Sequence, residues 1–149
     1  MRLWDIDAVL AVEHSAYSHP WTRGNFVDSL AVGHFAELLE DAQGGVVAYL
    51  LAMHGHEETH LLNLTVRPAL QGQGIGRTLL EGLIERVRER GDHRLWLEVR
   101  QSNAVARHLY ARAGMVEAGL RRGYYPAADD KREDGVVMQL TLRADDALD

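Results

Sequence analysis

The most informative acid in the chain is Glu98, which stands in a segment otherwise patterned for burial. Residues 94–99 read R-L-W-L-E-V and predict a strand with apolar side chains on both faces. A carboxylate in such a strand must be paired, solvated or functional, because burying an uncompensated charge is costly. General-base catalysis suits it, since an amine attacks an acyl carbon only after its ammonium form has lost a proton. The alternative is an ion pair with Arg94 or Arg100 at a sheet edge.

A tyrosine and an asparagine in the next segment add two polar groups. Asn103 and Tyr110 are seven residues apart within residues 103–113, which predict a helix. Two such positions lie within about 20° of one helical face. A tyrosine hydroxyl can protonate a leaving group, and an asparagine amide can hold a cofactor. The alternative is that Tyr110 is a half-buried packing residue.

Three alternating glycines, Gly72, Gly74 and Gly76, lie between a strand and a helix in residues 66–77, V-R-P-A-L-Q-G-Q-G-I-G-R. Glycine has no Cβ atom, so a ligand can approach the backbone closely. The first N–H groups of a helix have no intrahelical acceptor and lie at the positive end of its dipole. This stretch therefore predicts a binding site for phosphate, and specifically for a pyrophosphate.

The spacing of this turn does not fit the commoner nucleotide motifs. In the dinucleotide pattern G-x-G-x-x-G, Arg77 or Leu79 would occupy the place of the third glycine. No Gly-Lys-Ser/Thr follows, which excludes a P-loop. What remains is Q-x-x-G-x-G, formed by Gln71, Gly74 and Gly76. The alternative is a glycine-rich turn that only makes a tight connection.

Hydrophobic periodicity predicts the elements that must hold these residues in place. Residues 5–17 predict a helix, and a second helix begins at Thr22, with Trp21 and Phe26 placed for a hydrophobic staple. The helix after the glycine turn ends at Gly91. The expected strands are residues 34–40, 46–53, 59–66, 94–99, 115–120 and 135–142, with a long loop at residues 123–133. This order predicts an α/β (α+β) fold, in which helices flank a mixed, mostly antiparallel sheet.

Composition limits the classes of function. The 149 residues suit one domain, residues 1–149, and contain no cysteine, which excludes disulfides and a cysteinyl covalent intermediate. The formal charge of −6 argues against general nucleic-acid binding and suits a basic peptide or amine. No apolar run is long enough to cross a membrane, and the N-terminal residues do not resemble a secretory signal. We expect a cytoplasmic protein.

Residues 54–60, H-G-H-E-E-T-H, contain three histidines and two acids, so a metal site must be considered. Their spacing matches no zinc motif. A solvated hairpin loop is the preferred interpretation, and no metal is expected.

The glycine turn resembles the acetyl-coenzyme A motif of the GNAT N-acetyltransferase superfamily. Longer stretches resemble its RimI-type branch, whose members acetylate the N-terminal alanine of a small-subunit ribosomal protein. These are P-W at residues 20–21, L-W-L-E-V-R at 95–100, S-N-x-x-A at 102–106, L-Y at 109–110, R-R-x-Y-Y-P at 121–126 and R-E-D at 132–134.

The resemblance implies roles for individual residues. Glu98 would be the general base and Tyr110 the general acid of a direct attack in a ternary complex. Tyr124 and Tyr125 are assigned to the peptide-binding groove, where flat rings hold a chain at low entropic cost, or else they anchor their loop by packing. The residues implied to contact acetyl-coenzyme A are Leu64, Thr65, Val66, Gln71, Gly72, Gln73, Gly74, Ile75, Gly76, Arg77 and Asn103.

Two other functions stay open at this point. The acceptor can be a different amine, namely a polyamine, an amino acid, an antibiotic or a lysine side chain. The chain can also be a non-catalytic module that binds coenzyme A or a partner, although the presence of both Glu98 and Tyr110 argues against it. The range of N-termini accepted and the oligomeric state are not predicted, because a fold does not determine a substrate.

Overall fold

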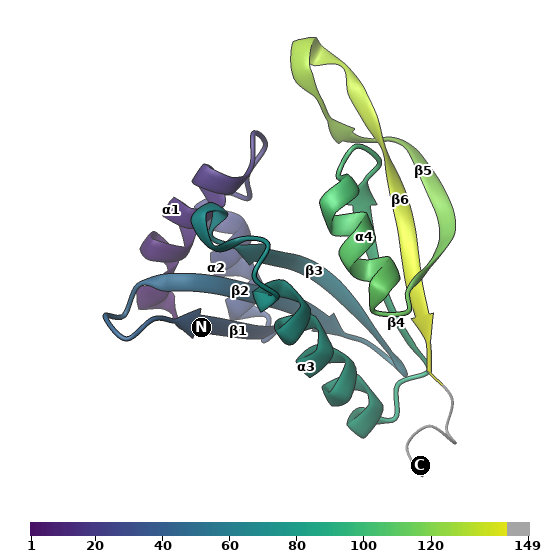
Figure 1. Ribbon diagram of the computed structural model, residues 1–149, viewed down its shortest axis with the longest axis horizontal. Coiled ribbons are helices and arrows are strands. Elements are labelled where there is room, and N and C mark those ends of the chain that lie inside the picture. The colour runs from purple at the N-terminus through teal and green to yellow at the C-terminus, as the bar shows by residue number, and fades with distance from the viewer. Residues whose placement is uncertain (143–149) are drawn as a thin grey trace. The chain divides into compact units, whose positions relative to one another are not determined.

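A computed structural model describes residues 1–142 of the chain. In this part, six strands form a sheet in the order β1-β2-β3-β4-β6-β5, which four helices accompany (Figure 1). The sheet is mixed, because β3 and β4 are parallel whereas β1–β2, β4–β6 and β5–β6 are antiparallel. This architecture confirms the predicted fold class. The strands are β1 (Phe35–Glu40), β2 (Val46–His54), β3 (Glu58–Val66), β4 (Arg94–Arg100), β5 (Val116–Pro126) and β6 (Arg132–Thr141), and the helices are α1 (Ile6–Ala16), α2 (Arg23–Ala31), α3 (Ile75–Arg90) and α4 (Ala104–Arg112).

The chain divides into two compact units. The first contains Met1–His54 and Leu62–Leu79. In this unit α1 contacts both α2 and β2. Its apolar core comprises Ile6, Val9, Val12, Phe26, Val46, Tyr49 and Leu51. The periodic apolar positions of α1 therefore become its buried stripe, as a surface helix requires.

The start of α2 has the capping arrangement predicted from its sequence. The Thr22 side chain accepts a hydrogen bond from the Asn25 backbone N–H at 3.2 Å, and Asn25 Oδ1 accepts one from the Thr22 backbone N–H at 2.9 Å. The rings of Trp21 and Phe26 lie 5.1 Å apart between centroids, which confirms the hydrophobic staple. These local contacts determine where the chain turns after α1.

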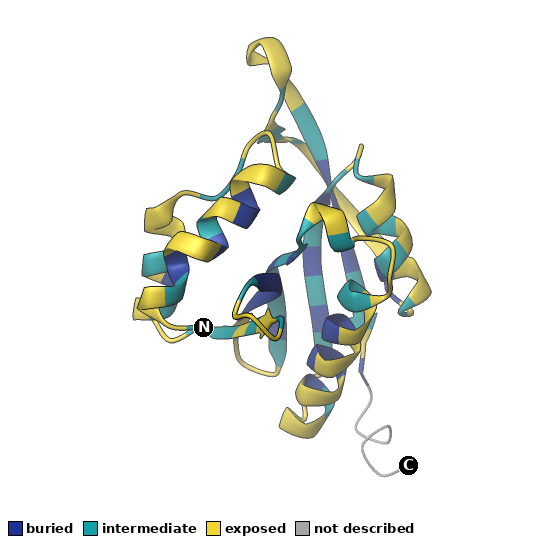
Figure 2. Cartoon of the chain, turned by 60° about the vertical axis from the view of Figure 1, so that its left-hand side comes forward, coloured by how far each residue is buried: buried dark blue, intermediate teal, exposed yellow. Residues whose placement is uncertain are grey.

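The second unit contains Gly55–Leu61 and the chain from Leu80 onward. Here the beginning of β3 pairs with β4, so that His60 stands opposite Trp96. On β4, Leu95, Leu97 and Val99 are buried, and the alternate residues are less so. Strand β3 shows the same alternation, which is visible on strands in Figure 2, whereas many residues of the helices are exposed.

The prediction of a long loop at residues 123–133 is wrong. Strand β5 continues to Pro126 and β6 begins at Arg132, so the connection is short and the two strands form an extended hairpin (Figure 1). The Arg132 guanidinium holds the far end by donating to the carbonyls of Gly123 and Tyr124 at 2.9 and 3.0 Å. The pairing is irregular between Arg121 and Tyr125, and that irregularity hides the strand pattern in the sequence.

Among the described residues 1–142, no helix is long and apolar enough to span a membrane.

Candidate functional site

The glycine turn in the first unit has the backbone that an anion site needs. Gly72 and Gly74 have φ of 81° and 83°, in the left-handed region that favours glycine. A Cβ atom added at either position would meet nothing within 4 Å, so the space beside the backbone is open. Helix α3 begins directly afterwards at Ile75, and the Thr78 N–H donates to the Gly74 carbonyl at 3.1 Å.

Gln71 ties this turn to the end of β3. Its Nε2 atom donates to the Val66 carbonyl at 3.0 Å. Val66 is the last residue of the segment Leu64, Thr65 and Val66, for which acetyl-coenzyme A contacts are predicted. The amide of Gln71 therefore orders the polypeptide that leads into the turn.

A buried polar network, missed in the sequence analysis, supports the same end of β3. Glu13 on α1 is 2% exposed and accepts hydrogen bonds from the Tyr49 hydroxyl at 2.6 Å and the Asn63 amide at 3.1 Å. Thr65 Oγ1 donates to Asn63 Oδ1 at 2.7 Å and also contacts the Tyr17 hydroxyl at 2.7 Å. Burial raises the pKa values of the Tyr17 and Tyr49 phenols, so both stay protonated donors.

The Trp21 backbone N–H also donates to Glu13, at 2.9 Å. One carboxylate thus joins α1, the chain that leads into α2, and strands β2 and β3. The polar residues at alternate positions of β3, Asn63 and Thr65, were the available sequence signal, because they interrupt residues 61–66, which are otherwise apolar.

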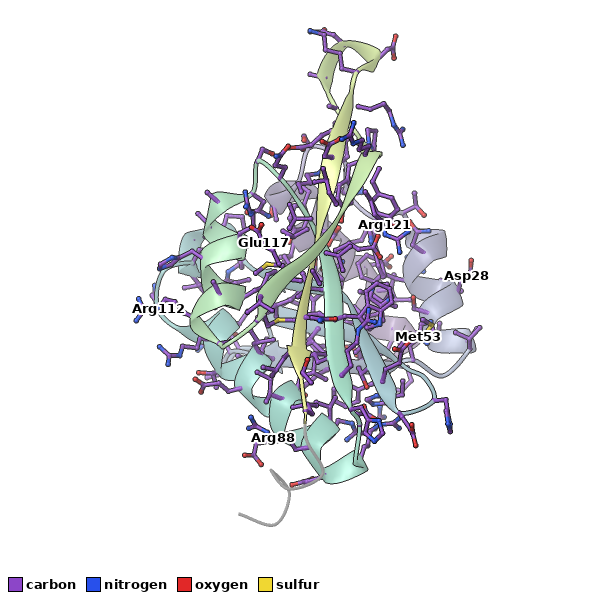
Figure 3. The ribbon with its side chains drawn as sticks, turned by 90° about the vertical axis from the view of Figure 1, so that its right-hand side faces the viewer. Asp28, Met53, Arg88, Arg112, Glu117 and Arg121 are labelled. Carbon is purple, nitrogen blue, oxygen red and sulfur yellow. The ribbon has the colours of Figure 1, made fainter. Side chains whose placement is uncertain are left out.

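In the second unit Glu98 lies where the sequence predicted, with its side chain only 6% exposed. Its Oε1 atom is 3.3 Å from His60 Nε2, and its Oε2 atom is 3.1 Å from Arg121 Nε. The Arg121 contact is an ion pair rather than a directed hydrogen bond, since Oε2 has no hydrogen-bond partner within residues 1–142. Figure 3 labels Arg121 on β5.

The two arginines considered as partners for Glu98 lie elsewhere. The Arg94 guanidinium lies 4.9 Å above the Trp96 ring. Arg100 donates to Glu133 at 3.1 Å and to the Pro126 carbonyl at 2.7 Å. The structure instead assigns Arg121 and His60 to Glu98, two residues for which the sequence analysis proposed no catalytic role. Their signals were the R-R-x-Y-Y-P segment and the alternation that places His60 on the less buried face of β3.

The His60 ring is stacked flat against a side chain of β4. Its ring stacks on Trp96 at 3.7 Å between centroids and 8° between planes. Burial lowers the pKa of His60, and the nearby negative charge of Glu98 opposes that shift. The neutral imidazole is therefore favoured beside the carboxylate.

Tyr124 and Tyr125 lie close enough to Glu98 for its charge to act on both phenols. Their rings pack edge to face at 4.9 Å, with Arg121 5.4 Å from the centre of the Tyr124 ring and Arg100 4.7 Å from that of Tyr125. Burial raises the pKa of both phenols. Glu98 adds to the rise at Tyr124 as a hydrogen-bond acceptor and as a charge, and at Tyr125 as a charge. The structure thus brings the predicted base and the predicted peptide-binding residues together.

Tyr110 lies in the predicted helix, whereas Asn103 lies just before its observed start. Asn103 precedes α4 and caps it, because its Oδ1 atom accepts a hydrogen bond from the Ala106 N–H at 3.2 Å. Asn103 has non-helical backbone angles, so the predicted helical spacing does not determine how it faces relative to Tyr110. Tyr110 is buried, rather than half-buried, within α4. Whether Asn103 also binds cofactor stays a prediction.

The loop before α4 is anchored by Glu133. Its carboxylate accepts hydrogen bonds from the Ser102 N–H at 2.8 Å and from Arg100 at 3.1 Å. Hydrogen bonding to Ser102, and then the contact with Arg100, holds the pKa of Glu133 below its usual value. This anchor sets the start of the helix that carries Tyr110.

Within residues 1–142, no three His, Asp or Glu side chains come together to hold a metal ion. In the histidine-rich segment, His56 is exposed whereas His60 faces Glu98.

The turn, the strand order and the buried carboxylate define an acyltransferase class. Residues 6–115 match the Acetyltransferase (GNAT) family, and the chain belongs to that family. It is an N-acetyltransferase that depends on acetyl-coenzyme A.

Relatives of known activity place the chain within one branch of the family. The ribosomal protein bS18-alanine N-acetyltransferases of Haemophilus ducreyi and Escherichia coli K12 are 36% and 38% identical to it over 138 residues, which is 93% of this chain and 94% and 92% of theirs. The crystal structure of the ribosomal-protein-S18-alanine N-acetyltransferase from Escherichia coli matches with a TM-score of 0.87 at 38% identity, covering 95% of this chain and 90% of that one. These similarities confirm the resemblance to the RimI-type branch.

Proposed function

We propose that the chain acetylates the N-terminal alanine of ribosomal protein bS18, with acetyl-coenzyme A as the donor. Relatives that align with nearly the whole chain are named for this activity. The observation that carries the proposal is the placement of the buried Glu98 carboxylate next to Tyr124 and Tyr125 of the β5–β6 hairpin. A base for the amine and flat rings for the peptide then occur in one place.

The glycine turn fits the donor that the family uses. Left-handed glycines with open space beside them, followed at once by the start of α3, suit the pyrophosphate of coenzyme A. We assign donor binding to Leu64, Thr65, Val66, the residues 71–77 and Asn103. When bound, acetyl-coenzyme A supplies the acetyl group as a thioester.

In the proposed mechanism, Glu98 takes a proton from the N-terminal ammonium group, so that the amine lone pair can attack the acetyl carbon. The Tyr110 hydroxyl gives a proton to the sulfur as the carbon–sulfur bond breaks. The nitrogen releases its second proton on becoming an amide, and a proton from solvent restores the Tyr110 hydroxyl. In this proposal the acetyl group passes directly from donor to amine, and the chain has no cysteine that could form a thioester intermediate. Holding both reactants together supplies much of the rate enhancement.

Steady-state kinetics on peptides tests this proposal. We expect an alanine-starting peptide to be acetylated, and spermidine and free lysine to be poor acceptors. Glu98→Gln and Tyr110→Phe should each reduce kcat by about 10²-fold or more, as loss of a general base or acid does. Glu85→Gln, which changes an exposed carboxylate on α3, serves as the control.

Near wild-type rates in both Glu98→Gln and Tyr110→Phe would overturn the catalytic assignments. Faster acetylation of spermidine or lysine than of every peptide would overturn the proposed acceptor and leave the assignment to the family unaffected.

We also propose that residues 1–149 act as one N-acetyltransferase domain in the cytoplasm, where ribosomal proteins are made, without nucleic-acid or membrane partners.

A further inference from the structure

His60 contacts the proposed base and is not part of the mechanism above. Its Nε2 atom lies 3.3 Å from Glu98 Oε1, and its side chain is 17% exposed. The ring cannot easily turn away, because it is stacked on Trp96 at a spacing of 3.7 Å. The register of β3 on β4 sets this geometry by placing His60 opposite Trp96, two residues before Glu98.

The charged groups around His60 have opposing effects on its pKa. From β4, Glu98 favours the protonated imidazole and Arg94 disfavours it, while from β5 Arg121 disfavours it and on β3 Glu58 favours it. Desolvation is larger than any of these effects and favours the neutral ring. At neutral pH the Glu98 carboxylate is therefore flanked by one permanent cation, Arg121, and one uncharged ring.

We propose that His60 is a positioning residue for the acyl transfer, which orients the Glu98 carboxylate while neutral and reduces its strength as a base when protonated. This inference rests on the proposed role of Glu98. A neutral imidazole N–H at Oε1 orients the carboxylate without adding charge. A protonated imidazole would add a second cation and stabilise the carboxylate, which then accepts a proton less readily.

Two substitutions separate orientation from titration. His60→Phe keeps a flat ring against Trp96 and removes the nitrogen that contacts Glu98. His60→Gln keeps an N–H donor and cannot become charged near neutral pH. His56→Gln in the same segment is the matched control, because the His56 side chain is 95% exposed.

We expect His60→Phe to reduce kcat with an alanine-starting peptide by about tenfold at pH 8, the size of effect that one charged hydrogen-bonding contact can produce. The KM for acetyl-coenzyme A should stay within about twofold. His60→Gln should keep most of the rate at pH 8. The ratio of the rate of His60→Gln to that of the wild type should rise as the pH falls below 7. Taking this ratio cancels the titration of the peptide amine, which is common to both proteins.

A second measurement does not depend on activity. The His60 imidazole resonance, assigned by its loss in His60→Gln, should titrate with a lower pKa in Glu98→Gln than in the wild type, because the Glu98 charge raises it. Unchanged rates in His60→Phe together with a pH-independent ratio for His60→Gln would overturn the inference. So would a His60 titration that is insensitive to Glu98→Gln. If Glu98→Gln itself stays fully active, the proposed base is wrong, and that failure is distinct from these two.

Discussion

Arg121 and Glu98 meet diagonally across β6: Arg121 pairs with Gly135, whereas Glu98 pairs with Val137, two residues further along the same strand. Their side chains nevertheless come within 3.1 Å. Strand β6 lies between the two strands that carry them, so the long Arg121 side chain reaches over β6 to the carboxylate. Gly135 has no side chain to separate the two strands on either side of it. The β5–β6 hairpin thus supplies the cation that faces the proposed base.

Replacing this cation should affect both activity and the neighbouring histidine. We expect Arg121→Gln to reduce kcat by about tenfold, because Glu98 loses the ion pair that holds its carboxylate in position. The pKa of His60 should rise, because Arg121 lowers it in the wild type. NMR titration of His60 and peptide kinetics measure the two effects. Arg122→Gln, at the exposed neighbouring position, should change neither.

Gly135 is under the two tyrosine rings, so the smallest side chain should disturb them. A Cβ atom there would lie 3.1 Å from Tyr125 Cε2 and 3.2 Å from Tyr124 Cδ1. We expect Gly135→Ala to raise the KM for peptide several-fold and to leave the KM for acetyl-coenzyme A unchanged. Gly82→Ala on α3, where nothing lies within 4 Å, is the control. Equal changes in both KM values would contradict a role in peptide binding.

Two glycines have nearly the same φ, so substituting each of them distinguishes backbone strain from an effect on ligand binding. Gly74 has φ of 83° and Gly33 has φ of 82°, and an added Cβ meets nothing within 4 Å at either site. Substitution by alanine should therefore cost each about 1–2 kcal/mol of stability. Only Gly74→Ala should also weaken acetyl-coenzyme A binding, by about tenfold or more, as measured by calorimetry. Equal affinities in the two variants would show that Gly74 does not approach the ligand.

Glu13 is expected to be a major contributor to stability. In Glu13→Leu the Tyr49 hydroxyl, the Asn63 amide and the Trp21 N–H lose their acceptor, at about 1–3 kcal/mol for each unsatisfied group. We expect the free energy of unfolding in urea to fall by about 3 kcal/mol or more. Glu13→Gln, which keeps one acceptor oxygen, should lose less. A loss no larger than that of Glu85→Leu on the exposed face of α3 would refute this network.

The stability of the protein should fall in mild acid through His60. Burial lowers the pKa of His60 in the folded state below its ordinary value of 6.5. Between that lowered pKa and 6.5 the unfolded chain binds more protons, so the free energy of unfolding decreases as the pH falls through this window. His60→Gln should remove this part of the pH dependence. Urea unfolding at several pH values between 5 and 8, with His56→Gln alongside, measures the difference.

Features that depend on local sequence were predicted well. The staple of Trp21 on Phe26 and the cap at Thr22 depend on residues a few positions apart, and both are present. The glycine turn was also visible, because backbone conformation there depends on glycine itself. Residues 123–133 were assigned to a loop because their acids and proline have low strand propensity, whereas cross-strand pairing and the Arg132 side chain extend the hairpin.

The sequence by itself was enough to identify the family, through its resemblance over several stretches, and to predict the fold class, the glycine turn and the strand in which Glu98 is buried, because these depend on the residue types and their order along the chain. Only the tertiary structure decided what surrounds that carboxylate. His60 comes from β3, whereas Arg121 and Tyr124 both come from β5, and the register of β3 on β4 and of β6 on its two neighbours brings them to Glu98. Strand register is a property of the folded sheet, since a shift by one residue would turn each of these side chains to the opposite face.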